Sequence, residues 1–120
     1  MLDRFSALPI FQEAHSLTLS IYKITTKFPE EKKFGLISQI RRSASSVPTN
    51  IVEGNARGHS KEMIEFPYIA KGSLEETKYH LLLAKDLGYI GEEDYIAVHD
   101  KADSVGKQLN GLINYWKKKV

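Results

Sequence analysis

The sequence predicts an all-α protein, an antiparallel up-down-up-down four-helix bundle. Apolar residues recur three and four positions apart in four segments, which is the spacing of one face of an α-helix. No segment alternates apolar and polar residues, and no Asn-Gly or Asp-Gly turn joins β-branched runs, so strands find no support. The connections between the four segments are short, as in bundles whose successive helices lie side by side.

The composition indicates one domain over residues 1–120, which is long enough to bury about two thirds of its unfolded surface. The sequence has no cysteine, which removes disulfides and thiolate sites and fits a reducing compartment. No apolar run approaches the ~20 residues of a membrane span, and the N-terminus has no signal-peptide pattern. We therefore expect a soluble, cytoplasmic protein that does not interact with membranes.

Prolines, glycines and charges set the expected ends of the first, third and fourth helices. The first helix is expected at about residues 9–28, because Pro9 suits a first turn and Pro29 ends the periodic run. The third, at about 60–88, has Ser60 as N-cap and Gly88 near its end. Pro67 predicts a kink or irregular first turns there. The fourth, at about 92–118, starts in acidic and finishes in basic residues, which suits the helix dipole.

The second helix, expected at about residues 34–57, contains Pro48. A proline inside a helix removes one backbone donor and clashes with the carbonyl four residues earlier, at a cost of about 3 kcal/mol. An apolar stripe that includes Ile40, Val47 and Ile51 nevertheless keeps its phase across the proline. We therefore predict one helix that is kinked at Pro48 and continues beyond it.

A second, polar stripe runs along the same helix, roughly 130° from the apolar one. It can be a solvated face, a buried network, or a surface for a partner. For Arg42 and Glu53 the sequence favours a buried or half-buried ion pair within the bundle, which would set helix register more than stability. The stripe consists of Gln39, Arg42, Ser46, Asn50, Glu53 and Arg57.

Charge is unevenly distributed, although the net charge is only +2. Residues 31–62 balance at +3, residues 63–100 at −5 and residues 101–120 at +4. Basic side chains in the positive regions are candidates for contacts with the phosphates of RNA or DNA, and tyrosines could stack on bases, although tyrosines in a bundle usually pack their rings. The candidate nucleic-acid contacts are Arg41, Arg57, Lys61, Lys117, Lys118 and Lys119.

Catalytic and metal-binding patterns are missing from the sequence, so we expect no enzyme, no metal and no cofactor. The four histidines form no His-x-x-x-His or Glu-x-x-His pair, and Glu76 with His80 is more typical of a hydrogen bond than of a metal site. Gly54 and Gly58 flank a helix end and form no phosphate loop. The serines at 43, 45 and 46 have no histidine base nearby in sequence.

Self-association is a further expectation. One sector of the second helix is small and nearly uncharged, and the third helix has apolar residues on more than one side. Such a helix is either central to a core or part of a subunit interface. The residues concerned are Ser38, Ser45, Pro48, Thr49, Val52 and Ala56 in the second helix, and Tyr68, Ile69, Leu82 and Leu83 in the third.

The runs FPEEKKFGLISQIRRSASSVPTNIVEG, FPYIAKGSLEE and QLNGLI resemble the four-helix-bundle family encoded in intervening sequences of bacterial 23S ribosomal RNA genes. The resemblance covers almost the whole chain, and Pro67 departs from an apolar family position. A more distant similarity is to the accessory variability protein of diversity-generating retroelements. The positions that match the family pattern are Gln39, Arg42, Ser46, Pro48, Asn50, Glu53, Gly54, Gly72, Ser73 and Glu76.

The resemblance implies a ring-like homopentamer without known enzymatic activity, in which the matching positions form a structural or assembly motif. The leading hypothesis is a non-enzymatic homo-oligomer that binds RNA or DNA through a basic surface formed by assembly. The alternative is a scaffold or accessory subunit for a separately encoded protein partner.

Overall fold

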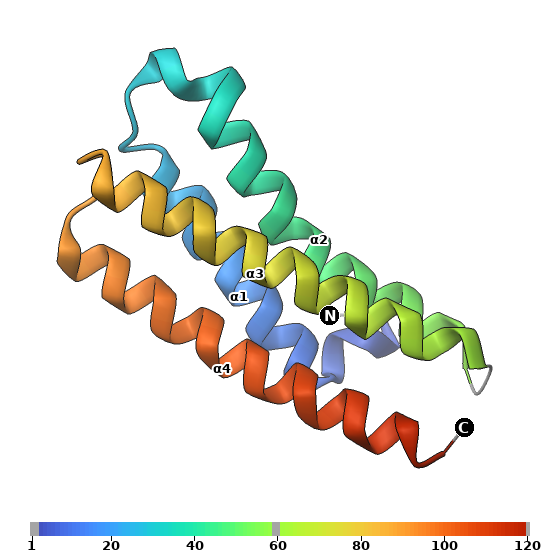
Figure 1. Cartoon of the computed structure of the whole chain (residues 1–120). Coiled ribbons are helices and arrows are strands. Elements are labelled where there is room, and N and C mark those ends of the chain that lie inside the picture. The colour runs from blue at the N-terminus through green and yellow to red at the C-terminus, as the bar shows by residue number, and fades with distance from the viewer. Residues whose placement is uncertain (1–2, 59–60, 120) are drawn as a thin grey trace.

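The structure, a computed structural model, describes residues 3–58 and 61–119. Within these ranges the regular secondary structure is entirely helical, and the predicted all-α class is confirmed. The connections between successive helices lie at alternating ends of the elongated molecule (Figure 1), and each helix packs against two neighbours, with α4 returning to α1. No helix in these ranges is long and apolar enough to span a membrane. The four long helices are α1 (Pro9–Thr25), α2 (Ser38–Ala56), α3 (Glu65–Asp86) and α4 (Glu92–Lys117).

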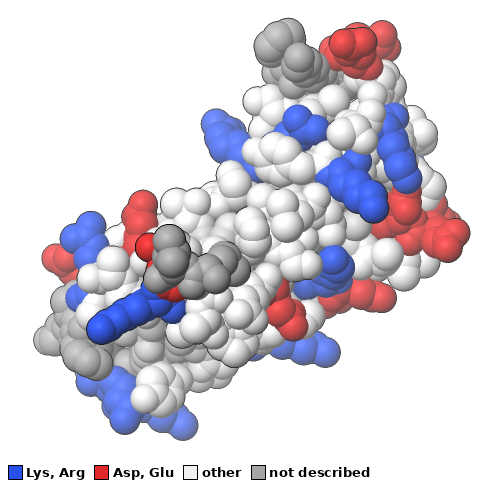
Figure 2. Space-filling view, turned by 180° about the vertical axis from the view of Figure 1, so that it is seen from behind, with Lys and Arg blue, Asp and Glu red and all other residues white. Residues whose placement is uncertain are grey.

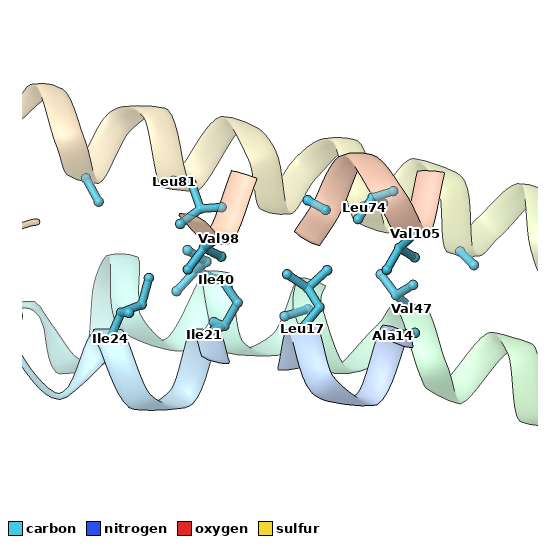
Figure 3. Packing of buried hydrophobic residues seen from close by; sticks show 14 of the residues in the cluster. Ala14, Leu17, Ile21, Ile24, Ile40, Val47, Leu74, Leu81, Val98 and Val105 are labelled. Atoms are coloured by element: carbon cyan, nitrogen blue, oxygen red, sulfur yellow. The ribbon is translucent and has the colours of Figure 1, made fainter. Parts of the chain in front are cut away.

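The apolar stripes of the four helices meet along the bundle axis. Leu17 and Ile21 of α1 are completely buried, as is Ile40 of α2. Figure 3 shows side chains from all four helices pointing toward one another in successive layers. Such layers follow from the three- and four-residue spacing, which places one apolar residue per turn on the inner face. The residues labelled in the figure are Ala14, Leu17, Ile21, Ile24, Ile40, Val47, Leu74, Leu81, Val98 and Val105.

The second helix continues through Pro48, and a side chain from α1 explains how. Proline has no backbone N–H, so the carbonyl of Ala44 loses its usual donor within the helix. The hydroxyl of Thr18 reaches that carbonyl across the α1–α2 seam, with an Oγ1 to oxygen distance of 3.1 Å, and shares its proton with the carbonyl of Ala14 in its own helix at 3.0 Å. A buried carbonyl left unpaired would cost about 1–3 kcal/mol, so this contact offsets much of the penalty of the proline. The kink expected at Pro48 stays a prediction.

The third helix begins later than the sequence suggests. A 3-10 turn over Lys61–Ile64 precedes it, and Pro67 is its third residue. In the first turn a proline removes no helical hydrogen bond, which explains why α3 accommodates Pro67. The 3-10 turn is the irregular start that was expected around Pro67. The proposed N-cap Ser60 lies outside the described residues. At the other end, Gly88 adopts a left-handed φ of 81°, and Tyr89 N–H donates to the Ala84 carbonyl, as in a Schellman cap.

The α2–α3 pair has the most extensive contact in the bundle. Gly54 permits it, because a Cβ at that position would lie 3.0 Å from the Cβ of Phe66. Hydroxyls line the same seam further along. Ser43 Oγ and Thr77 Oγ1 are 2.8 Å apart, and the Thr77 hydroxyl is also 2.8 Å from the carbonyl of Ser73.

The α1–α4 seam differs, because exposed polar pairs reinforce it. Lys27 forms an ion pair with Asp94 at 2.9 Å. Lys101 donates to Ser20 at 2.9 Å, and Ser104 donates to Glu13 at 2.7 Å. Such exposed contacts contribute little individually, typically below about 1 kcal/mol each.

Candidate nucleic-acid interface

Most of the predicted basic contacts gather at one end of the bundle. The α2 helix ends at Ala56, directly before Arg57, and α4 ends at Lys117. Figure 1 places these two ends at the same end of the bundle, where α3 also begins. Arg57 and all three residues of the run Lys117, Lys118 and Lys119 are exposed. We call this set of four residues the basic end.

Aromatic rings lie beneath three of these cations. The guanidinium carbon of Arg57 is 5.3 Å from the centre of the Phe66 ring. Lys117 Nζ is 5.6 Å from the Tyr68 ring centre, which ties the end of α4 to the start of α3. Lys119 Nζ is 5.2 Å from the ring of Tyr115. At exposed sites such cation–π contacts contribute about 0.5–1 kcal/mol, so they orient the cations without neutralising them.

Carboxylates are present at the same end but do not pair with these cations. Glu62 and Glu65 are exposed at the start of the third helical segment. Among the described residues, no ion pair joins a cation of the basic end to a carboxylate. Figure 2 shows Lys and Arg side chains at the lower-left end of the molecule with some acidic groups among them, and a largely uncharged surface between the two ends. The excess of unpaired cations is what an anionic ligand would use.

Arg41 is a correction to the sequence-based interpretation, which counted it among the exposed contacts. Its Nε donates to Thr25 Oγ1 at 2.8 Å, and its Nη2 donates to the Tyr22 carbonyl at 3.3 Å. The guanidinium also lies over the Tyr22 ring, 4.6 Å from its centre. These contacts hold the half-buried side chain against the end of α1, away from the basic end. The side chain of Lys61, the remaining candidate, lies outside the described residues.

The polar stripe of α2 divides into an inner and an outer part. Ser46 and Asn50 are half-buried: Ser46 Oγ is 2.8 Å from Ser73 Oγ on α3, and Asn50 donates to the Ser46 carbonyl at 2.7 Å. This inner part is a helix–helix network. The outer part, with Gln39, Arg42 and Glu53, is exposed.

The ion pair favoured for Arg42 and Glu53 does not form. Neither side chain makes an ion pair with any described residue of the same chain. The physical reason is their direction, because both point to the outer side of α2 while the core-facing positions are apolar. The motif therefore presents two opposite, unpaired charges on one face of the bundle.

Gly72 and Glu76 of the same motif are also exposed, on α3. A Cβ on Gly72 would meet nothing within 4 Å. Glu76 accepts from the histidine one turn later, with 3.2 Å between His80 Nε2 and the carboxylate, as the spacing predicts. His80 is buried, and its Nδ1 has no hydrogen-bond partner among the described residues.

An ion pair between α3 and α4 is the clearest electrostatic feature of the described residues. Lys78 Nζ lies 2.8 Å from Asp103. Burial lowers the pKa of Lys78, but the hydrogen bond to Asp103 and the charges of Glu75 and Asp103 raise it more, so the pKa lies above its ordinary value. The hydrogen bond from Lys78 likewise holds the pKa of Asp103 below its ordinary value, against a smaller opposing effect of burial.

The same aspartate belongs to a group that the sequence analysis missed. Ligand atoms of His99, Asp100 and Asp103 lie within 4.8 Å of one another. The four-residue spacing of His99 and Asp103 on one helix was the available signal. Because the Lys78 ammonium already forms an ion pair with the carboxylate of Asp103, the cluster is an ion-pair network and not a cation site.

The fold and the hydroxyl-lined α2–α3 seam define a small four-helix-bundle protein. Residues 6–111 match the model of the 23S rRNA-intervening sequence protein family, and the chain belongs to this family. A similar solved structure is that of a protein with unknown function from the S23 ribosomal protein family of Bacteroides thetaiotaomicron VPI-5482. It is 28% identical, with a TM-score of 0.76, over 87% of this chain and 97% of that chain. No curated protein matches the chain significantly.

Proposed function

We propose that this protein is a non-enzymatic, self-assembling bundle that binds RNA or DNA through the basic end. One observation supports this most directly: four exposed cations, from the ends of α2 and α4, lie at the same end of the bundle without ion-pair partners among the described residues. A single copy offers only a modest charge, and its binding would be weak. Repeating the basic end around a homo-oligomer multiplies the number of phosphate contacts that one nucleic acid can make.

A salt titration tests the nucleic-acid part of the proposal. Fluorescence anisotropy with a labelled RNA should show binding at low salt that weakens steeply as salt rises, because phosphate contacts release counterions. The double variant Lys118→Gln and Lys119→Gln should weaken binding and reduce the salt slope. Lys23→Gln with Lys107→Gln removes the same charge from exposed positions elsewhere and serves as the matched control. Binding that is absent at low salt, or equally weakened by both double variants, contradicts the proposal.

Assembly is proposed to use the face where α2 meets α3. The exposed motif residues Arg42 and Glu53 offer opposite charges to a second copy. Ile69 is 50% exposed and lies one turn before Ser73, so it borders the same seam. Exposed apolar side chains beside unpaired charges are typical of a subunit interface. The family resemblance suggests five subunits.

Native mass spectrometry with and without RNA measures the subunit number and the RNA stoichiometry together. Ile69→Glu should lower the assembled fraction, because it places a charge in the proposed contact. Ile96→Glu is the control, since Ile96 is also 50% exposed but lies on α4. A wild-type monomer at all accessible concentrations refutes the assembly part.

The second candidate function is a scaffold for another protein. It is favoured by apolar exposure toward the end of the third helix, where Leu82 is 39% exposed and Leu87, directly after the helix, is 53% exposed. This role predicts a stable oligomer that does not bind nucleic acid at low salt. The two candidates therefore give opposite results in the same anisotropy titration.

A further inference from the structure

We propose that the basic end binds single-stranded nucleic acid, with unpaired bases stacking on Tyr68 and Tyr115. This inference rests on the proposed nucleic-acid binding and specifies the substrate class. Tyr68 is 43% exposed and Tyr115 is 57% exposed, and a lysine of the basic end lies beside each ring. Aromatic rings interleaved with unpaired cations are the arrangement by which proteins hold single strands, since bases stack on the rings while the cations follow the phosphates.

Other cation–aromatic pairs in the molecule differ from these two. Arg41 lies over Tyr22, but its guanidinium is already hydrogen-bonded to Thr25. Lys85 lies 5.0 Å from the ring centre of Tyr95, but it is half-buried and 3.8 Å from the carboxylate of Asp86. Exposed rings with exposed, unpaired cations are thus concentrated at the basic end.

The placement of the two rings suits one continuous strand. Tyr68 lies near the start of α3 and Tyr115 near the end of α4. The contact of Lys117 with Tyr68 shows that these two helix ends adjoin. Packed helices lie about 8–10 Å apart, so a single flexible strand can reach both rings.

A duplex would use the same surface poorly. Its bases are stacked and paired inside the helix, so only its phosphates can reach the protein. A duplex therefore gains the contacts of Lys118 and Lys119 without the stacking contribution, which is about 1–3 kcal/mol for each base. Single strands should consequently bind roughly tenfold or more tighter than duplexes of the same length at equal salt.

Anisotropy titrations with a short single-stranded RNA, the same sequence as DNA, and the matched RNA duplex test the inference on the full chain. Tyr68→Leu and Tyr115→Leu should each weaken single-strand binding by roughly fivefold or more and leave duplex binding unchanged. Tyr115→Phe keeps the ring and should retain the affinity. Tyr79→Leu is the matched control, because Tyr79 is 58% exposed on α3 and has no cation over its ring among the described residues.

The outcomes separate this inference from the function on which it rests. Duplex binding as tight as single-strand binding, or tyrosine variants that bind like the Tyr79 control, overturns the stacking inference. Lysine variants that still weaken binding would then leave the proposed nucleic-acid binding intact. Absence of binding to all three probes at low salt overturns both. Comparison of the RNA and DNA strands identifies which of the two nucleic acids the site prefers. Circular dichroism of each variant checks that the bundle remains folded.

Discussion

The hydroxyl of Thr18 should be needed only because position 48 is a proline. Thr18→Val keeps the shape of the side chain but removes the donor that the buried carbonyl of Ala44 shares with the carbonyl of Ala14. With Pro48 in place, that carbonyl then has neither an N–H nor a hydroxyl partner, and the loss of stability should be about 1–3 kcal/mol. For a chain of 120 residues, 1 kcal/mol corresponds to roughly 4 °C in Tm.

In a Pro48→Ala background the same substitution should have little effect. The backbone N–H restored at position 48 can bond the Ala44 carbonyl, so Thr18→Val should then cost less than about 0.5 kcal/mol. The two costs define a double-mutant cycle with a coupling energy of about 0.5–3 kcal/mol. Because the cycle subtracts the cavity left by the buried proline ring, only the shared hydrogen bond remains in the difference.

Urea unfolding followed by circular dichroism gives the four free energies of unfolding. Thr49→Val is the control for loss of a threonine hydroxyl, because Thr49 bonds only the carbonyl of Ser45 in its own helix and is exposed. A coupling energy within about 0.3 kcal/mol of zero would refute the explanation given for the continuity of α2.

Two further predictions concern α2–α3 packing and pH. Gly54→Ala should destabilise the fold by about 1 kcal/mol or more, because the new Cβ would lie 3.0 Å from Phe66 Cβ. At Gly111 a new Cβ meets nothing within 4 Å, so Gly111→Ala should stabilise the helix by up to about 1 kcal/mol. Equal shifts in Tm for the two variants would contradict this prediction. Asp103→Asn should cost about 0.2–1 kcal/mol near neutral pH. The folded-state pKa of Asp103 lies below 3.8, so its contribution to stability is present above that pH and is lost as the pH falls through the folded-state pKa. The free energies of unfolding of the wild type and Asp103→Asn should therefore converge in acid. A difference in stability that persists at pH 2 would exclude the ion pair as its source.

Periodicity predicted the helices well because each depends on residues close in sequence. The apolar stripe of α2 stays in phase across Pro48, and this alone indicated one continuous helix. The reason for the continuity was not predictable, since Thr18 lies in another helix and its hydroxyl gives no local signal. The predicted start of α3 was too early, because Ser60 is a residue type that often caps helices. Pro67 was the better signal, since proline is suited to the first turn of a helix, where it lies in the structure.

The candidate site was predictable only where the residues follow helix ends. Arg57 follows the end of α2, and the lysine run lies at the end of α4. Because the second and fourth helices of an antiparallel bundle run in the same direction, these residues lie at the same end of the bundle. Arg41 looked equally exposed in sequence, but its partners Thr25 and Tyr22 come from α1. Arg42 and Glu53 were expected to form an ion pair because opposite charges lay in one stripe. A stripe determines only on which side of the helix its residues lie, and it does not determine whether another helix covers that side.

The polar reinforcement of the α1–α4 seam has a consequence for the order in which the bundle forms and opens. Contacts of α1 with α2, and of α2 with α3, join neighbours in the chain, whereas Ser104 and Glu13 are 91 residues apart. Closing that long loop carries the largest loss of chain entropy among these pairings, and the exposed polar pairs add only weakly to the apolar contacts that oppose this loss. We therefore expect α4 to dock on α1 last during folding and to separate from it first, so that amide hydrogen exchange reaches this seam before it reaches the hydroxyl-lined seam of α2 and α3.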